Sequence, residues 1–290
     1  MRVAVPLEEK AEQLSAALPP LMIEAERVAA AVSLGVHGRR KAGIGETFWQ
    51  FRHYRTEDAS SAIDWRQSAK STHLYVRERE WEAAQGVWFW RDGSAGMRFR
   101  SGDISKRDRA NLIAAALASL LIRGGERVAL FGSGRSPSSS RLALRRFAHA
   151  LGDTRSVAAA LPPEAQIARF GQLVWLSDFL SPLPDIEKRF AWFTRFAVHA
   201  YIVHIIDPAE EDFPYTGRTR FEAADGTLDE TLGRAESVGD AYRLRFRAHA
   251  GSVAMAARKF GWTYASHRTD SPPTAALLGL FSEMSGATRR

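Results

Sequence analysis

Residues 86–97 read Gly86-Val-Trp-Phe-Trp-Arg-Asp92-Gly-Ser94-Ala-Gly-Met97, an apolar run followed by a small polar turn. The apolar run is typical of a buried strand, and the glycines and serine behind it indicate a tight turn. Asp92 then stands at the carboxyl end of a strand, where a parallel α/β sheet carries its functional loops. This stretch therefore predicts both the fold class and the place of a site.

The residues that follow alternate between apolar strands and amphipathic helices, which is the pattern of a mostly parallel, Rossmann-like α/β sheet flanked by helices. Apolar positions repeat at helical spacing over 106–123, and Gly124-Gly125 ends that helix. Residues 212–233 look irregular, with a small hairpin around Phe213 and Phe221. We expect further strands over 127–133, 172–178, 197–207 and 262–267, and further helices over 142–151, 185–196, 240–260 and 274–284.

Residues 1–84 predict an N-terminal extension, with the α/β domain over 85–290. Its first part, 7–34, reads as a helical region that Pro19-Pro20 interrupts. A basic, glycine-punctuated stretch follows, and then an aromatic block that contains Arg52, Arg55 and Arg66. Arginine clamps carboxylates and stacks on aromatic rings. These arginines therefore either form a docking surface for an acidic partner or a nucleic acid, or pair with nearby carboxylates and pin the block to the α/β domain.

The composition excludes several classes of function. No apolar run approaches the ~18 residues that span a bilayer, and the acidic Glu8-Glu9 start is unlike a signal peptide. We therefore expect a cytoplasmic protein. The chain has no cysteine, which excludes disulfides and thiolate chemistry. It also has no GxSxG, Walker A or HExxH motif, so the sequence indicates no enzyme.

The net charge is +7, and residues 91–155 carry thirteen basic side chains against five acidic ones. A basic surface attracts nucleic acid or an acidic protein. No zinc-finger, basic-zipper or aromatic RNA-binding pattern accompanies the charge. A basic nucleic-acid-binding protein or a metal-dependent nuclease is therefore the alternative to a protein-binding one.

Asp92, Ser94 and Asp178 together suggest a cation site. A carboxylate followed two residues later by a hydroxyl offers the hard oxygen ligands that Mg²⁺ and Mn²⁺ prefer. Asp178 ends another predicted strand and would add a second carboxylate at the same edge of the sheet. Asp and Ser also cap helices and form turns, so the same spacing allows a purely structural role.

Several short runs between residues 35 and 180 together match the sequence pattern of a known family. They are Gly43-Ile-Gly-Glu-Thr-Phe48, Arg52-His-Tyr54, Ile63-Asp-Trp-Arg66, Tyr75-Val-Arg-Glu78, Asp92-Gly-Ser-Ala-Gly-Met97, Arg123-Gly-Gly-Glu-Arg-Val128 and Leu176-Ser-Asp-Phe179. In these runs the chain resembles the family catalogued as domain of unknown function fifty-eight. The resemblance implies a von Willebrand factor A-like fold.

The resemblance also implies a metal-ion-dependent adhesion site, built from a DxSxS turn, a threonine and an aspartate. Asp92 and Ser94 match the first two turn positions, and Asp178 matches the aspartate. The third turn position is Gly96, which has no hydroxyl, and Ser139 is the candidate for the threonine position. The implied Mg²⁺ or Mn²⁺ would therefore bind weakly or not at all.

Members of this family are often encoded beside MoxR-type AAA+ ATPases. The resemblance therefore implies a non-enzymatic scaffold or adaptor that helps such an ATPase to chaperone or activate a client. On this hypothesis, the protein partner meets the loops that hold Asp92, Ser94 and Asp178.

Overall fold

The computed structural model describes residues 25, 27–32, 48–54, 65–70, 73–79, 86–153, 159–224, 226–227 and 229–287. The chain has two compact units, one within residues 39–85 and the other an α/β unit that begins again at Gly86. The expected boundary between residues 84 and 85 lies one residue before the observed one. The expected extension is not one unit, however, because part of it joins the core of the α/β unit: Ala25, Val28, Ala29 and Val32 are all buried there.

The α/β unit is built on five parallel strands in the order β4-β3-β5-β6-β9. This confirms the predicted parallel α/β fold. The chain leaves the second strand of the row, β3, for the edge strand β4, and then crosses back to β5 on the other side of β3. The strands are β3 (Gly86–Arg91), β4 (Arg127–Leu130), β5 (Gln172–Ser177), β6 (His199–Ile206) and β9 (Thr263–Arg268).

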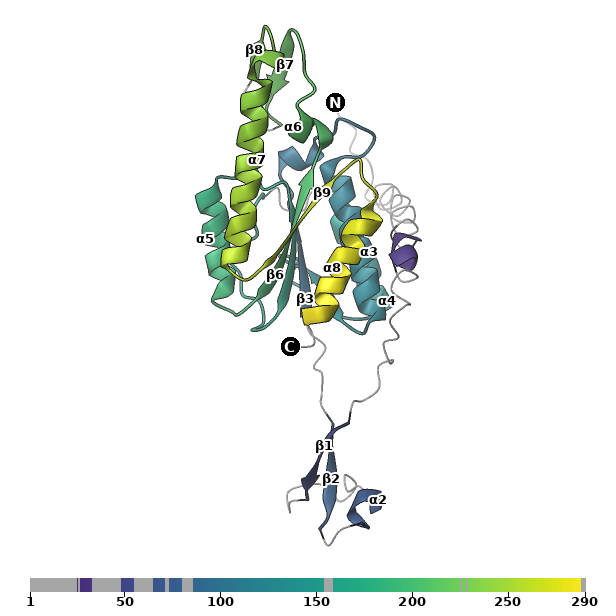
Figure 1. The fold of residues 1–290 in the computed structure, drawn as a ribbon. Helices are drawn as coiled ribbons and strands as arrows, with labels where there is room; N and C mark the ends of the chain where they lie inside the picture. The colour runs from purple at the N-terminus through teal and green to yellow at the C-terminus, as the bar shows by residue number, and fades with distance from the viewer. Residues whose placement is uncertain are drawn as a thin grey trace, which may run out of the picture. The chain divides into compact units, whose positions relative to one another are not determined.

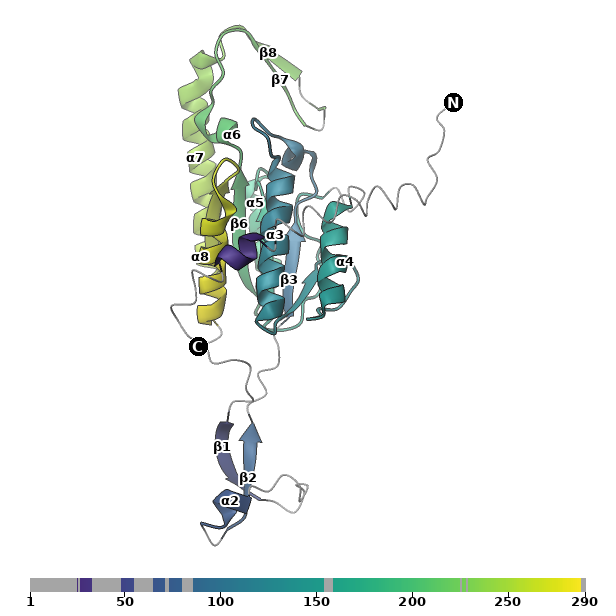
Figure 2. The same cartoon turned by 90° about the vertical axis from the view of Figure 1, so that its right-hand side faces the viewer.

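Helices cover both faces of this sheet (Figure 1; Figure 2 turns the view by 90°). One face carries α3 (Lys106–Arg123), α4 (Arg141–Gly152) and α8 (Pro273–Ala287). The other face carries α5 (Leu183–Thr194) and α7 (Glu236–Lys259). The short helices η2 (Ala95–Arg98) and α6 (Pro208–Asp212) follow the carboxyl ends of β3 and β6.

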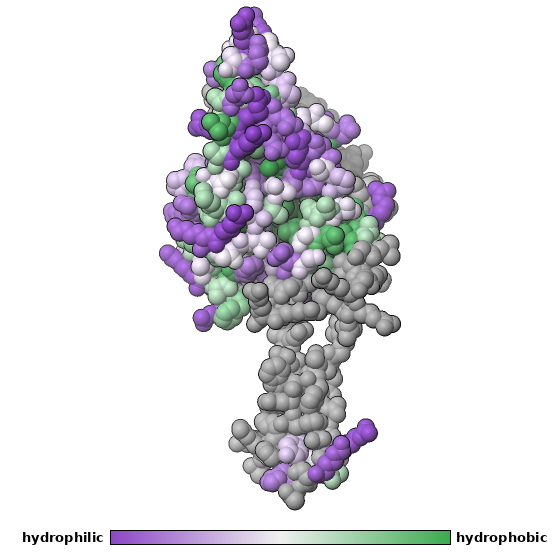
Figure 3. Space-filling model, viewed as in Figure 1, coloured by the Kyte–Doolittle hydropathy of each residue, from purple (hydrophilic) through white to green (hydrophobic). Residues whose placement is uncertain are grey.

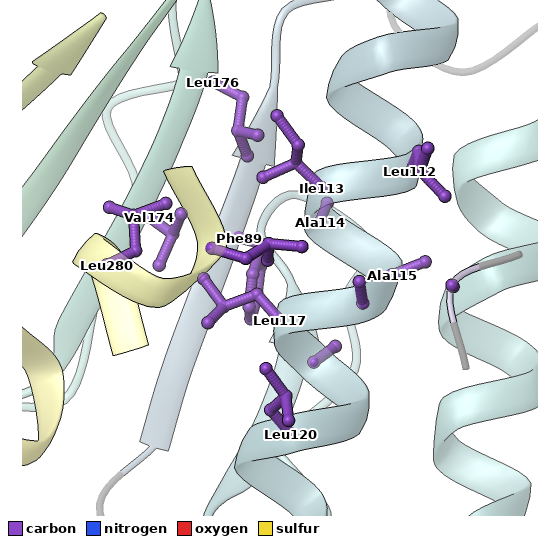
Figure 4. Close-up of a cluster of buried hydrophobic side chains, with 14 of the residues drawn as sticks. Phe89, Leu112, Ile113, Ala114, Ala115, Leu117, Leu120, Val174, Leu176 and Leu280 are labelled. Carbon is purple, nitrogen blue, oxygen red and sulfur yellow. The ribbon is translucent and has the colours of Figure 1, made fainter. Parts of the chain in front are cut away.

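The core lies in two layers because successive strand residues point to opposite faces. Phe89 and Val174 pack toward α3, whereas Trp90 and Trp175 pack toward α5. Figure 4 shows Phe89 and Val174 against Leu117 of α3 and Leu280 of α8. All six residues of β5 are buried, as expected for a central parallel strand.

The predicted elements of this unit are confirmed, with two differences. The predicted strand 127–133 ends at Leu130, because the chain turns there and Gly132 takes a φ of 83°. The region 212–233 contains a hairpin, as expected, with β7 (Thr219–Glu222) paired with β8 (Asp229–Leu232). Phe221 lies in β7, but Phe213 precedes the hairpin at the end of α6 (Pro208–Asp212). Helix α6 was not predicted, although Asp207-Pro-Ala-Glu210 has the spacing of a capping box with proline at the first helical position.

The unit within residues 39–85 contains an antiparallel pair, β1 (Phe48–His53) and β2 (Tyr75–Arg79), and the single turn α2 (Trp65–Ser68). Ser68 ties that turn to the hairpin by accepting a 2.9 Å hydrogen bond from the Tyr75 backbone N–H. The backbone of Arg52 lies opposite Val76.

Candidate functional site

The candidate site lies where the path of the chain reverses across the sheet. The connection after β3 leads to one side, and the chain returns to β5 on the other side, so the loops after these two strands diverge. Open α/β sheets bind ligands outside the carboxyl ends of the strands at such a point. In this chain the side chains there are largely buried, and we use the word crevice for the cluster of Asp92, Asp178, Lys106 and Glu210. Asp92 directly follows β3 and Asp178 directly follows β5, so the two predicted carboxylates do come together here.

The side chain of Asp92 is fully buried, and both of its carboxylate oxygens are engaged. Oδ1 accepts a 2.7 Å hydrogen bond from the Ser94 backbone N–H, and Oδ2 accepts a 2.6 Å hydrogen bond from the Ser177 hydroxyl. Burial raises the pKa of Asp92 to about 6, and the nearby Asp178 adds to the shift, whereas the bonds from Ser177 and Ser94 oppose it. Asp92 thus holds the turn after β3 against the end of β5.

Asp178 forms an ion pair with a lysine that the sequence analysis missed. Its Oδ2 lies 2.9 Å from Nζ of Lys106, the first residue of α3, and its Oδ1 accepts a 3.2 Å bond from the Leu180 N–H. The Lys106 side chain has no exposed surface and also pairs with Glu210 of α6. Burial lowers the pKa of Lys106, but the two carboxylates outweigh it and the net shift is upward.

Helix α6 brings Glu210 to the site through its capping box. Asp207 accepts a 2.9 Å bond from the Ala209 N–H, and Glu210 accepts a 3.0 Å bond from the Asp207 N–H. Asp207 also accepts bonds from the backbone N–H and the hydroxyl of Ser101, which ties α6 to the loop before α3. Burial raises the pKa of Glu210, and Lys106 opposes that rise.

Gly96 occupies the place of the missing hydroxyl, and the Asp178 carboxylate uses the space. A Cβ atom on Gly96 would lie 2.9 Å from Asp178 Oδ2 and 3.8 Å from Ser94 Oγ. The first of these distances is shorter than real Cβ contacts. A serine at this position would therefore need Asp178 to move.

Ser139 does not belong to this site, so the prediction that it supplies the threonine-like ligand is wrong. After β4 the chain turns back, and Ser138 forms an antiparallel bridge with Val128. Val128 lies beside Val87 in the sheet, five residues before Asp92. At ~3.3 Å per strand residue, Ser138 lies ~16 Å below the level of Asp92, and Ser139 continues away from it.

The donor set does not fit a divalent cation. Both Asp92 oxygens and both Asp178 oxygens already accept hydrogen bonds, the third turn position has no side-chain oxygen, and an ammonium lies against Asp178. Among the described residues, no group of three or more His, Asp or Glu side chains is arranged to hold a metal ion.

Arg52, Arg55 and Arg66 belong to the other unit of the chain, within residues 39–85. Arg66 is exposed in α2 next to Trp65, which is 64% exposed. Arg52 lies in β1, and Arg55 lies outside the described residues. Whether these arginines contact a partner stays a prediction.

In the part of the chain that the structure describes, no helix is long and apolar enough to cross a membrane. The chain is 26% identical over 273 residues to "Uncharacterized protein Rv1480" of Mycobacterium tuberculosis (strain ATCC 25618 / H37Rv). The matched region covers 89% of this chain and 86% of that protein. "Uncharacterized protein Mb1516" of Mycobacterium bovis (strain ATCC BAA-935 / AF2122/97) matches to the same extent.

Two solved structures are similar to 70% of this chain over 99% of their own length, each with a TM-score of 0.41. One is titled "Crystal structure of conserved hypothetical protein BatB from Bacteroides thetaiotaomicron" and is 11% identical. The other, 13% identical, is described as an aerotolerance-related membrane protein from Bacteroides fragilis NCTC 9343. The family described as "Protein of unknown function DUF58" matches residues 50–252, which is well over half of the sequence, and the chain belongs to that family.

Proposed function

We propose that this chain is a non-enzymatic protein-binding scaffold or adaptor, and that it meets its partner through the outer face of α7. One observation carries the proposal. Helix α7 has 24 residues and leaves two large apolar side chains in solvent, since Leu244 is 73% exposed and Met255 is 64% exposed. Exposed apolar side chains that gather on one surface often mark a protein-binding site.

Leu244 and Met255 lie on the same side of α7, because eleven residues make about three turns and span ~16 Å. Ala248 and Gly251 are exposed between them at helical spacing, which makes an apolar stripe. The opposite side of α7 packs into the core that it shares with α5, through Val253, Ala256 and Ala257. The stripe is therefore a second apolar face on a helix whose first face already covers the sheet.

The charge around the stripe indicates what kind of partner it fits. Residues 241–259 contain four arginines, one lysine and no Asp or Glu. Exposed cations border the stripe on both sides: Arg245, Arg247, Arg258 and Lys259. An amphipathic helix with acidic residues beside its apolar face is complementary to this surface in both respects.

The start of α7 packs against the hairpin arm that precedes it in the chain. Phe213 holds the base of the hairpin arm against α7, with its ring centroid 5.7 Å from that of Phe221 and 4.7 Å from that of Tyr242. Hydrophilic side chains predominate on the part of the molecule that carries β7, β8 and the start of α7 (Figure 3). Asp92 and Asp178 are buried, so we infer that their loops shape this end of the sheet without touching the partner themselves.

The family resemblance supports a MoxR-type AAA+ ATPase as one partner and a client protein as another, with the chain as the link between them. A direct test mixes the wild-type chain with such an ATPase from the same source organism. It measures the affinity of the two proteins for each other and the rate of ATP hydrolysis with and without the chain. Replacing both Leu244→Lys and Met255→Lys should weaken binding at least ~10-fold, or about 1.4 kcal/mol, because the apolar contact is lost and two ammonium groups would be buried against the apolar face of the partner.

Leu142→Lys is the matched control, because Leu142 is a 53% exposed leucine on α4. It should bind like the wild type. No binding by the wild-type chain would contradict the adaptor role with this ATPase, and equal binding by the double variant would exclude the α7 face as the contact.

A basic nucleic-acid-binding protein is the second candidate. A cavity of about 330 Å³ between β4 and α4 is lined by two arginines from the basic stretch, Arg135 and Arg146, and by four serines, with no acidic side chain. Nucleic acid binding would weaken steeply with salt, because phosphate contacts release counterions, and a gel shift at rising salt tests this. A metal-dependent nuclease is less well supported, because the donor set at Asp92 and Asp178 does not fit a divalent ion.

A further inference from the structure

Lys106 occupies a position that is unfavourable for a cation on two counts. It is the first residue of α3, where the helix dipole favours negative charge. It also has no exposed surface, and an ammonium group loses its hydration when it is buried. Other groups must therefore hold it there.

Two carboxylates from different loops provide that compensation. Asp178, at the end of β5, lies 2.9 Å from Nζ, and Glu210, on α6 after β6, pairs with the same atom. The ring of Phe99 lies 5.9 Å from Nζ and adds a cation–π contact. One buried ammonium thus joins the start of α3 to the loops that follow two neighbouring strands.

Among the described residues, Lys106 is the cation that pairs with both of these carboxylates. His204 is buried close by and bonds to the Tyr264 hydroxyl at 2.7 Å. Burial lowers the pKa of His204 to about 4, so this ring is neutral at pH 7. Arg91 directs one guanidinium nitrogen to the Asp92 carbonyl oxygen at 3.2 Å and another to the Leu151 carbonyl oxygen at 3.4 Å.

We propose that the ammonium of Lys106 is the resident cation of this crevice, and that it takes the place of the divalent ion that the fold resemblance implies. A metal ion joins loops by drawing oxygen ligands from each of them, and Lys106 does the same through Asp178 and Glu210. Gly96 fits this arrangement, because the absence of a side chain leaves room for the Asp178 carboxylate beside Lys106. The loops at this end of the sheet are then held without metal.

The assignment predicts that removing Lys106 uncovers a cation site. In Lys106→Met, the Asp178 and Glu210 carboxylates are left facing a space that held a positive charge. Mn²⁺ or Mg²⁺ should then raise the melting temperature by several degrees, and bound Mn²⁺ should be visible by electron paramagnetic resonance. The wild type should show neither effect, and Lys106→Met with Glu210→Gln should lose the response, because one carboxylate ligand is gone.

Lys188→Met is the control, since Lys188 is an exposed lysine on α5 and its loss should leave metal binding unchanged. A wild type that binds Mn²⁺ and loses this binding in Asp92→Asn would overturn the proposal. A Lys106→Met variant with a native circular dichroism spectrum and no response to metal would overturn it as well. If that variant does not fold, the wild-type and Asp92→Asn titrations decide. Mn²⁺ binding that Asp92→Asn abolishes refutes the proposal, and no binding, or binding that Asp92→Asn leaves unchanged, supports it.

This assignment is independent of the adaptor role. The ATPase binding assay can fail while the Mn²⁺ titration still finds no metal in the wild type. The Mn²⁺ titration can equally find metal while the ATPase binds through α7.

Discussion

Replacing Gly96 by serine restores the hydroxyl that a DxSxS turn would carry, and it separates two accounts of the crevice. If the crevice binds a divalent ion, the added hydroxyl is a further ligand and should strengthen metal binding. If Lys106 is the resident cation, the added atoms only collide with Asp178, whose Oδ2 would lie 2.9 Å from the new Cβ.

Asp178 cannot move away without loss, because its Oδ2 pairs with Lys106 and its Oδ1 accepts the Leu180 N–H. Extra atoms in a closely packed site cost about 1–3 kcal/mol. For a domain of this size each kcal/mol lowers the melting temperature by ~2–4 °C, so Gly96→Ser should melt ~2–12 °C below the wild type.

Urea and thermal unfolding, each with and without Mg²⁺, measure this directly. The matched control is Gly102→Ser in the loop before α3, where a Cβ atom has no neighbour within 4 Å, and it should stay within about 0.5 kcal/mol of the wild type. A Gly96→Ser variant that Mg²⁺ stabilises, while the stability of the wild type does not change with Mg²⁺, would refute the reasoning, because that response requires a bound metal ion.

Two further predictions follow from buried groups. The pKa of Asp92 is raised from 3.8 to about 6, so the folded state binds this proton more tightly and stability falls as pH rises from about 4 to about 6. Asp92→Asn should remove that fall, and urea midpoints with the same pH slope in both proteins would contradict it. Phe190 is fully buried with its ring centroid 4.8 Å from that of Trp262, so Phe190→Ala should cost about 3–5 kcal/mol of unfolding free energy. Phe170→Ala, at a 64% exposed position, is the control in the same denaturation assay and should change stability little.

Much of the fold was predictable because its signals are local. The apolar run 172–177 fits a strand buried on both faces, and the spacing of apolar residues over 106–123 fits a helix that covers a sheet. Even the unpredicted helix α6 has a local signal in Asp207 and Glu210, since a capping box depends only on residues three apart.

The site was predictable only in part. Asp92 and Asp178 could be placed together because parallel strands bring their carboxyl ends to one edge of the sheet. Ser139 was misplaced because the sequence does not show that the chain turns back beside β4, which the bridge between Ser138 and Val128 reveals.

The sequence by itself determined the strand and helix pattern, the parallel sheet and the two carboxylates at its edge, because each depends on short-range periodicity or on a general rule of parallel sheets. Only the tertiary structure decided what neutralises those carboxylates. Lys106 reads in the sequence as an ordinary lysine at the start of a helix, and its partners Asp178 and Glu210 lie 72 and 104 residues away. Contacts over such separations depend on how the loops close over the sheet, and no local pattern records that packing.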